Sequence, residues 1–179
     1  MLAITDEIYL SVLSIEDAET VTALLQDKEI SDNTLLIPYP YTLDDAKQWL
    51  SDSIIIEEEN GRHENYSIRN SGHEFIGVIS MHFNYGENTE RSEFGYWLGK
   101  KHWNKGIMTE VIKKFCEMAK EKYRIKFLEA FVFDFNEASM RALTKAGFTK
   151  TRKKEKRTRI DGTKVTAVKF EKELKMNSV

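Results

Sequence analysis

The sequence predicts one α/β (α+β) domain over residues 1–179, with helices packed on a central mixed and mostly antiparallel sheet. Segments whose apolar residues recur at helical spacing alternate with short runs rich in β-branched and aromatic residues. The chain has no internal repeat, linker or low-complexity segment, and its 179 residues suit a single core. A single layered domain therefore explains the pattern with the fewest assumptions.

Two helices are expected in the first half of the chain. The first opens at Glu16-Asp17 and carries apolar residues at helical spacing. Thr42 is expected to cap the second, with Asp45 supplying part of a capping box, and this helix should end near Ile55. The expected turns and loops are 31–40, which holds both prolines, the polar break 57–61, and the turns 70–72, 84–88 and 161–162.

The second half is expected to hold two more helices and most of the strands. One helix runs from Thr109 to about Lys122, and the other from Asn136 to Ala146, where Gly147 ends it. The run 128–133 is apolar enough to predict a strand buried on both faces. The expected strands are 10–13, 66–69, 75–83, 91–98 and 128–133, followed by a hairpin of 148–159 with 165–170.

Composition and charge limit the function classes. Hydrophobic residues make up 41% and charged residues 31%, and the net charge of −2 argues against a global field for nucleic acid or membrane. No run approaches a membrane span, and no secretory signal is visible. The single cysteine, Cys116, lies on an apolar helix face and is expected to be a buried structural thiol. We expect a cytoplasmic protein, monomeric or homodimeric, without a membrane partner.

The segment from Trp103 to Glu110 carries the strongest functional signal. It lies between a predicted strand and a predicted helix, and Gly106 lets the backbone approach a ligand there. The free N–H groups of a helix start favour an anion such as phosphate. The Walker loop and the dinucleotide fingerprint are both excluded by spacing, because each needs further glycines. Taken alone, a lone glycine is also compatible with a simple tight turn.

Several motifs accompany this segment in a fixed order. They are Gly95-Tyr96-Trp97-Leu98, then Trp103-x-Lys105-Gly106-x-Met108-Thr109-Glu110, then Asn136-x-x-Ser139, and finally Gly147-Phe148. This series resembles the GNAT superfamily of acyl-CoA-dependent N-acyltransferases, and within it the Rim-type branch of ribosomal-protein N-terminal (alanine/serine) acetyltransferases. The resemblance implies the GNAT fold, with about six to seven strands, about four helices and a splayed strand pair that holds the cofactor.

The resemblance also implies where acetyl-CoA binds as co-substrate. Its pyrophosphate would rest on the backbone N–H groups of 105–109, beside the Lys105 cation, and Asn136 would bond the pantetheine arm. Trp103 and Met108 depart from the broad family pattern, although Trp103 suits the Rim-type branch. The expected cofactor-binding residues are Trp97, Leu98, Trp103, Asn104, Lys105, Gly106, Ile107, Met108, Thr109, Asn136 and Ser139.

Two residues are expected to be catalytic. The resemblance gives Glu93 the place of the general base, acting through a water, and places the Ser139 hydroxyl beside the cofactor sulfur as the acid. The attack of an amine on a thioester also needs a donor at the developing oxyanion, for which a backbone N–H near Leu98 is the candidate. Glu93 is equally compatible with a solvated strand residue, and Ser139 with a surface serine behind the Asn136 cap.

The acceptor is the least determined part of the prediction. An α-amine loses its proton more readily than a lysine, which favours a protein N-terminus, and a ribosomal protein or the ribosome is a possible partner. A small amine (polyamine, amino acid or aminoglycoside), a non-catalytic acyl-CoA sensor, and an RNA- or ribosome-binding module using Lys150–Arg159 remain alternatives. The loop 31–41 and the turn 161–162 are expected to wall the acceptor cleft. The histidines are too scattered for a metal site.

Overall fold

The computed structural model describes residues 1–83 and 89–175. The chain forms two compact units, and the strands β4 (Phe75–Phe83) and β5 (Arg91–Leu98) each run from one unit into the other. The first unit holds residues 1–80, 96–103 and 158–163, and the second holds the rest. The predicted turn at 84–88 lies outside the described residues. The assignment of 1–179 to a single domain stays a prediction.

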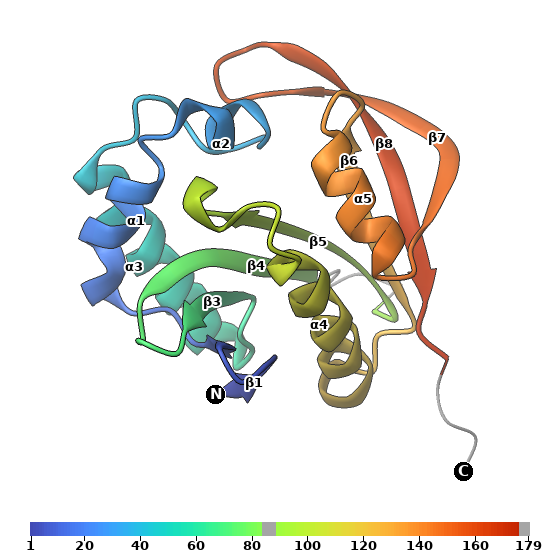
Figure 1. The fold of residues 1–179 in the computed structure, drawn as a ribbon, viewed down its shortest axis with the longest axis horizontal. Coiled ribbons are helices and arrows are strands. Elements are labelled where there is room, and N and C mark those ends of the chain that lie inside the picture. The colour runs from blue at the N-terminus through green and yellow to red at the C-terminus, as the bar shows by residue number, and fades with distance from the viewer. Residues whose placement is uncertain (84–88, 176–179) are drawn as a thin grey trace. The chain divides into compact units, whose positions relative to one another are not determined.

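The first unit is built on an antiparallel meander. The strands β1 (Leu2–Ala3), β2 (Ile8–Ser11), β3 (Asn65–Asn70) and β4 follow one another in that order, and each pairs antiparallel with the next. A short 3₁₀ helix, η1 (Ile15–Asp17), leads into α1 (Ala18–Leu24), which packs beside α3 (Leu43–Asn60) (Figure 1). The remaining elements are α2 (Lys28–Asp32) and the 3₁₀ helix η2 (Lys100–His102).

Local signals explain how α3 begins and why it is longer than expected. Thr42 accepts the N–H of Asp45, and the Asp45 carboxylate accepts the N–H of Thr42, so the predicted capping box is confirmed. The predicted end near Ile55 is wrong, because the acidic run forms the last turn and Gly61 ends the helix with a φ of 64°. Glu57 is 6% exposed and stays in the helix because its carboxylate accepts backbone N–H groups of the following loop.

The second unit combines parallel and antiparallel pairing. Its strands lie in the order β5, β6 (Phe127–Phe133), β8 (Lys164–Glu173) and β7 (Thr149–Thr158). β5 pairs parallel with β6, and β6 pairs antiparallel with β8 over seven residues. The helices α4 (Ile107–Tyr123) and α5 (Glu137–Lys145) contact each other. β6 is half-buried at Phe127, Glu129 and Phe131 and buried at its other four positions, so the prediction of a strand buried on both faces is wrong.

Each unit has its own core. In the first, helix residues pack on β4 around Val21, Ala46 and Leu50, all of which are fully buried. In the second, the Phe94 ring lies 5.9 Å from that of Phe115 and 5.3 Å from that of Phe148. The described residues form eight strands and five α-helices, slightly more than the sequence predicts, because β1 has only two residues and α2 only five.

Candidate active site

The loop before α4 reverses the chain with two residues in the left-handed region. Asn104 has a φ of 59° and Gly106 a φ of 78°. Glycine adopts this conformation without the steric cost of a Cβ, and asparagine tolerates it better than most residues. Gly106 is the N-cap of α4, and no side chain accepts a hydrogen bond from the start of this helix. The helix therefore begins two residues earlier than predicted, directly after the glycine.

The uncapped start of α4 leaves backbone donors available. The N–H of Glu110 donates to the carbonyl of Gly106 over 3.3 Å. Within the described chain, the N–H groups of Ile107, Met108 and Thr109 have no acceptor, as expected for the first turn of a helix. A Cβ built on Gly106 would have no heavy atom within 4 Å, so the approach is open. Three convergent donors and the positive helix end suit an anion such as a diphosphate.

The β5–β6 ladder is short. It pairs Arg91 with Phe127 and ends where Glu93 meets Glu129, although both strands continue past that point. Phe94, the next residue of β5, is buried, whereas Gly95 is half-buried. Because parallel strands pair by evenly spaced backbone hydrogen bonds, the end of the ladder releases backbone groups of both strands. The expected general base, Glu93, is the last residue of β5 that pairs with β6.

Glu93 is bound by Arg157, which the sequence offers only as part of the basic run 150–159. The Arg157 guanidinium donates to both carboxylate oxygens of Glu93, over 2.9 and 3.2 Å, and lies 3.9 Å from the centre of the Phe131 ring. Burial opposes the charge on Arg157, but hydrogen bonds and charges from Glu93 and Glu155 outweigh it and raise the pKa of Arg157. A carboxylate has about four lone-pair sites, so Glu93 can still accept a hydrogen bond from water.

Asn136 and Ser139 come together at the start of α5. The Asn136 side-chain oxygen accepts the backbone N–H of Ser139 over 3.1 Å, so the predicted cap is confirmed. Ser139 lies in the first helical turn and is half-buried. Its role as the acid stays a prediction. At the other end of the helix, Gly147 has the positive φ expected for the residue that terminates it.

Trp97, Leu98 and Trp103 belong to the first unit. The indole N–H of Trp103 donates to the carbonyl of Leu98 over 2.6 Å, and both tryptophans pack against the hydrophobic core of that unit. A Cβ on Gly77 would collide with the Trp97 carbonyl, so only glycine allows β4 to approach β5 this closely. The Trp103 indole thus fixes the backbone at Leu98, the expected source of the oxyanion donor.

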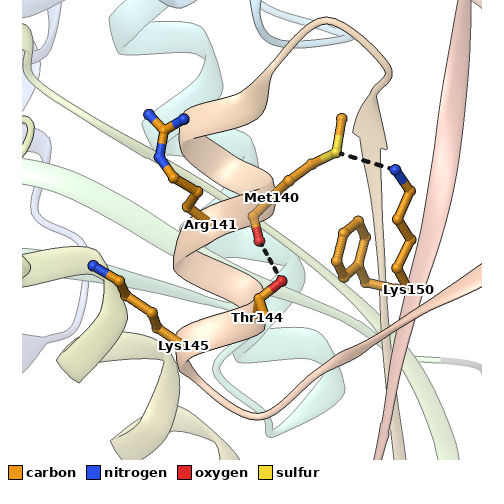
Figure 2. Close-up of a pocket in the computed structure, with 6 residues that line it drawn as sticks. Met140, Arg141, Thr144, Lys145 and Lys150 are labelled. Atoms are coloured by element: carbon orange, nitrogen blue, oxygen red, sulfur yellow. Dashed lines mark hydrogen bonds between the residues drawn. The ribbon is translucent and has the colours of Figure 1, made fainter.

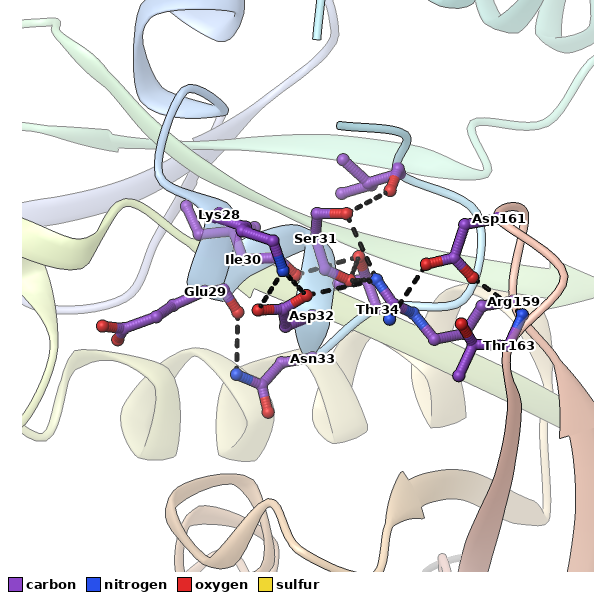
Figure 3. Close-up of polar contacts among 11 residues, drawn as sticks. Lys28, Glu29, Ile30, Ser31, Asp32, Asn33, Thr34, Arg159, Asp161 and Thr163 are labelled. Carbon is purple, nitrogen blue, oxygen red and sulfur yellow. Dashed lines mark hydrogen bonds and ion pairs between the residues drawn. The ribbon is translucent and has the colours of Figure 1, made fainter. Parts of the chain in front are cut away.

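The loop 31–41 and the tip of the last hairpin meet in the first unit, as Figure 3 shows. Arg159, whose side chain is 10% exposed, donates to the backbone carbonyl of Ser31 over 3.0 Å and pairs with Asp161 at 3.2 Å. The N–H of Ile160 donates to the carbonyl of Leu35 over 2.9 Å. The hairpin tip is therefore fastened to α2 and to the loop that follows it.

Three aromatic residues in or after the loop 31–41 differ in how much of the side chain reaches solvent. Tyr41 is 6% exposed and belongs to the core; burial and, to a smaller extent, the charge of Asp45 raise its pKa to about 12. Trp49 also packs against the core, whereas Tyr39 is 49% exposed. Tyr41 is therefore a packing residue, and only Tyr39 of these three presents much of its ring to solvent.

Cys116 is a buried free cysteine, as predicted. In residues 1–83 and 89–175, no three or more His, Cys, Asp or Glu side chains are grouped so as to hold a metal ion. No helix in the described parts of the chain has the length and apolar character needed to cross a membrane.

The family assignment rests on a match over most of the chain. Residues 7–149 match the model of the acetyltransferase (GNAT) domain. The chain belongs to the GNAT acetyltransferase family. It is 29% identical over 147 residues to the uncharacterized N-acetyltransferase YoaA of Bacillus subtilis (strain 168), covering 82% of this chain and 81% of that protein. It is 36% identical over 87 residues to the probable N-acetyltransferase YjcK of the same organism, about half of each chain. The family match and these relatives together show that the chain is an N-acetyltransferase.

Solved GNAT structures share the fold. The ribosomal-protein-S5-alanine acetyltransferase from Vibrio fischeri superposes with a TM-score of 0.81 at 17% identity, covering 98% of this chain and 97% of the other. The microcin C7 self-immunity acetyltransferase MccE, in complex with acetyl-CoA and AMP, has a TM-score of 0.78 at 22% identity over 95% and 94%. RimL, in complex with coenzyme A, has a TM-score of 0.79 at 16% identity over 96% and 97%. At these identities the comparisons establish the GNAT fold and leave the acceptor open.

Proposed function

We propose that this GNAT protein transfers an acetyl group from acetyl-CoA to the N-terminal α-amine of a protein, by direct attack of the amine on the thioester. The observation that carries the proposal is the uncapped start of α4 behind Gly106, where three backbone N–H groups have no acceptor among the described residues. A GNAT chain with an open anion site of this kind is suited to the diphosphate of acetyl-CoA.

The proposed binding residues follow the chain from β5 to α5. The backbone from Lys105 to Thr109 holds the diphosphate, with Lys105 as a nearby cation and Trp103 and Asn104 shaping the loop. Beyond the β5–β6 ladder, the backbone of β5 near Trp97 and Leu98 offers hydrogen bonds to the amides of the pantetheine arm. At the start of α5, the capping residue Asn136 contacts the arm and Ser139 faces its sulfur. Bound acetyl-CoA supplies the activated acetyl thioester.

The proposed chemistry assigns one task to each group. The amine must reach the thioester without its extra proton, which Glu93 accepts through a water, since its two oxygens already accept hydrogen bonds from Arg157. The backbone N–H of Leu98 stabilises the oxyanion, and the Trp103 indole holds the Leu98 carbonyl in place. Ser139 donates a proton to the departing thiolate. The thioester C–S bond breaks as the amide C–N bond forms.

The pairing of Glu93 with Arg157 favours an acceptor that deprotonates easily. An α-amine has a reference pKa of about 8 and a lysine of about 10.4, so loss of the proton near neutral pH costs roughly 3 kcal/mol less for the α-amine. A single carboxylate that is already hydrogen-bonded, working through a water, suits the easier of these two reactions. The proposed acceptor is therefore an α-amine, and we propose a ribosomal protein as its source, acetylated in the cytoplasm.

The loop 31–41 and the turn 161–162 are the proposed wall of the acceptor cleft. Arg159 ties the hairpin tip to α2, so the loop 31–41 and the turn 161–162 are held together before an acceptor arrives. Leu36 and Ile160 are 71% and 54% exposed on these two segments, beside the hydrogen bond from Ile160 to Leu35. Exposed apolar side chains at a fixed spacing suit a short peptide better than a small polycation.

A small amine is the second candidate acceptor. It is supported by the fold shared with MccE, a self-immunity acetyltransferase whose structure contains AMP beside acetyl-CoA. The two candidates differ in what the loop 31–41 and the hairpin tip must contact, because a small amine needs only the backbone near Glu93. A catalytically inactive acyl-CoA sensor would still bind the diphosphate at the start of α4, but Glu93 and Ser139 would have no catalytic role.

The test is an acceptor screen with purified protein and acetyl-CoA. Peptides with free N-terminal alanine or serine, their N-blocked forms carrying an internal lysine, and a set of polyamines and aminoglycosides are compared by thiol release and by product mass. We expect acetylation of the free N-terminal peptides alone. Faster turnover of a polyamine or aminoglycoside would favour the second candidate, and thiol release with none of the amines would favour the sensor.

A further inference from the structure

A row of basic side chains lies on one face of β7. The positions Lys150, Arg152, Lys154 and Lys156 alternate along the strand and are all exposed. Side chains two residues apart point to the same face of a strand. Lys150 identifies this face, because its amine approaches the Met140 sulfur of α5 at 3.8 Å. We call these four residues the β7 basic row.

The acidic partners available to β7 lie on its opposite face. Lys153 pairs with Glu155 at 2.7 Å, and Arg157 binds Glu93 and contacts the Phe131 ring. By contrast, no member of the β7 basic row forms an ion pair with any residue that the structure describes. From the sequence, Lys150–Arg159 is a single basic run. In the structure, the cations on one face of β7 form ion pairs, and those on the other face do not pair with any described residue.

The β7 basic row meets α5 at Lys150. A shallow hollow of about 330 Å³ lies between α5 and the last two strands, with Arg141 and Lys145 on its helix side and Lys150 opposite (Figure 2). Arg141 pairs with Glu137 at 3.3 Å, but both side chains are more than 60% exposed, so this pair is weak in water. In Figure 2 the charged ends of Arg141 and Lys145 point away from Lys150, so the row itself consists of its four β7 cations.

The arrangement suits a linear polyanion better than a single anion. Alternate residues of a strand are about 6.6 Å apart, so four of them span roughly 20 Å. The side chains extend in parallel from the strand and do not converge on one point, as they would around an isolated phosphate. β7 also ends the strand order of the second unit, so its outer edge is not covered by another described strand.

The chemistry of the β7 basic row favours a phosphodiester backbone over an acidic protein segment. The row contains no aromatic or aliphatic residue, and a protein interface normally needs an apolar centre. Without aromatic residues the face cannot stack on bases, so it would bind a nucleic-acid strand regardless of sequence. The net charge of −2 keeps the attraction local to this face. We propose that the β7 basic row binds the phosphodiester backbone of a nucleic-acid strand.

The test measures binding of the full-length protein to a fluorescein-labelled oligouridylate of about 20 nucleotides, by anisotropy over a range of salt concentrations. Four phosphate contacts on a single strand predict a slope of log K against log salt of about −3. The variant R152Q/K154Q/K156Q should bind at least ten-fold more weakly, with the slope reduced by about 2. Acetyl-CoA at saturation should not displace the strand.

The matched control removes the same charge from α4. Lys113 and Lys114 pair with Glu110 and Glu117 on that helix, and K113Q/K114Q/K120Q should leave the affinity and the slope unchanged. Equal binding by a deoxyoligonucleotide would support the backbone as the ligand, and tighter binding by RNA would add a contact to the 2′-hydroxyl.

Four outcomes would overturn the proposal. They are no binding at low salt, equal losses in the β7 and α4 variants, binding of polyglutamate or anionic vesicles as tight as that of the oligonucleotide, and displacement by acetyl-CoA. If the protein does not bind the oligonucleotide at low salt, the lysines of β7 would be explained as charges that keep an edge strand from aggregating. Melting temperatures of both variants close to that of the wild type would exclude unfolding as the cause of a loss.

Discussion

Replacing Gly106 with alanine separates the folding role of this glycine from its proposed role in binding. Its φ of 78° lies in the region that side chains with a Cβ adopt at a cost of about 1 kcal/mol or slightly more. No heavy atom lies within 4 Å of the added Cβ, so backbone strain is the only expected cost. For a chain of this size the melting temperature should fall by about 2–4 °C.

Gly61 provides a matched control for this substitution. It has a φ of 64°, ends α3, and also has no atom within 4 Å of an added Cβ, so Gly61→Ala should cost about the same stability. The two variants should differ in coenzyme A affinity. Gly106→Ala moves the donors at the start of α4 and is expected to weaken binding at least ten-fold, about 1.4 kcal/mol, whereas Gly61→Ala should bind like the wild type.

Isothermal titration with coenzyme A and thermal unfolding measure the two effects separately. If Gly106→Ala lost stability as expected but bound coenzyme A with wild-type affinity, the backbone from residue 105 to 109 would not hold the diphosphate. If both variants lost affinity equally, the loss would reflect general destabilisation. Either result would show that Gly106 has no specific role in binding coenzyme A.

Three further predictions concern catalysis, acid stability and thiol reactivity. Ser139→Ala should lower kcat about 100-fold or more while the Kd for coenzyme A stays constant, and an unchanged kcat would remove the hydroxyl from the mechanism. Burial opposes the charge of Glu129, but hydrogen bonds from Lys169 and Arg91 outweigh it and lower its pKa. The stability that Glu129 contributes is therefore complete above its ordinary pKa of 4.5 and is lost as the pH falls through the lower pKa of the folded state. In urea unfolding, the free energy of unfolding of the wild type should exceed that of Glu129→Gln at pH 7, and the difference should shrink progressively below pH 4.5. Burial raises the pKa of Cys116 to about 11, so a thiol reagent at pH 8 should modify it only after denaturation, and fast modification of the folded protein would contradict its burial.

The elements that could be predicted from sequence are those with strong local signals. The strands 75–83 and 91–98 match β4 and β5 in both bounds, because turn residues flank each of these runs. The capping box at Thr42 is likewise a local pattern. The end of α3 is not predictable in this way, because Glu57 is stabilised by N–H groups of Glu64 and Asn65, beyond the window in which periodicity is read.

The backbone features of the candidate site could be predicted from the sequence, but the side-chain contacts between residues far apart in the chain could not. The glycine before α4 and the Asn136 cap are local features, and both appear where expected. The partner of Glu93 is Arg157, 64 residues later, and no spacing rule connects them. The sequence does contain one indication of this contact. Glu155 interrupts the basic run two residues before Arg157, so both side chains lie on the same face of the strand, and this face can be expected to meet charged partners.

The proposed function depends on the start of α4 holding the diphosphate of coenzyme A. The most direct measurement follows the backbone amide signals of Gly106, Ile107, Met108 and Thr109 by ¹⁵N–¹H NMR during titration with coenzyme A and, separately, with pantetheine, which lacks the diphosphate. We expect large shifts of these four amides with coenzyme A and small ones with pantetheine. Saturable binding of coenzyme A that leaves these amides unmoved would contradict it.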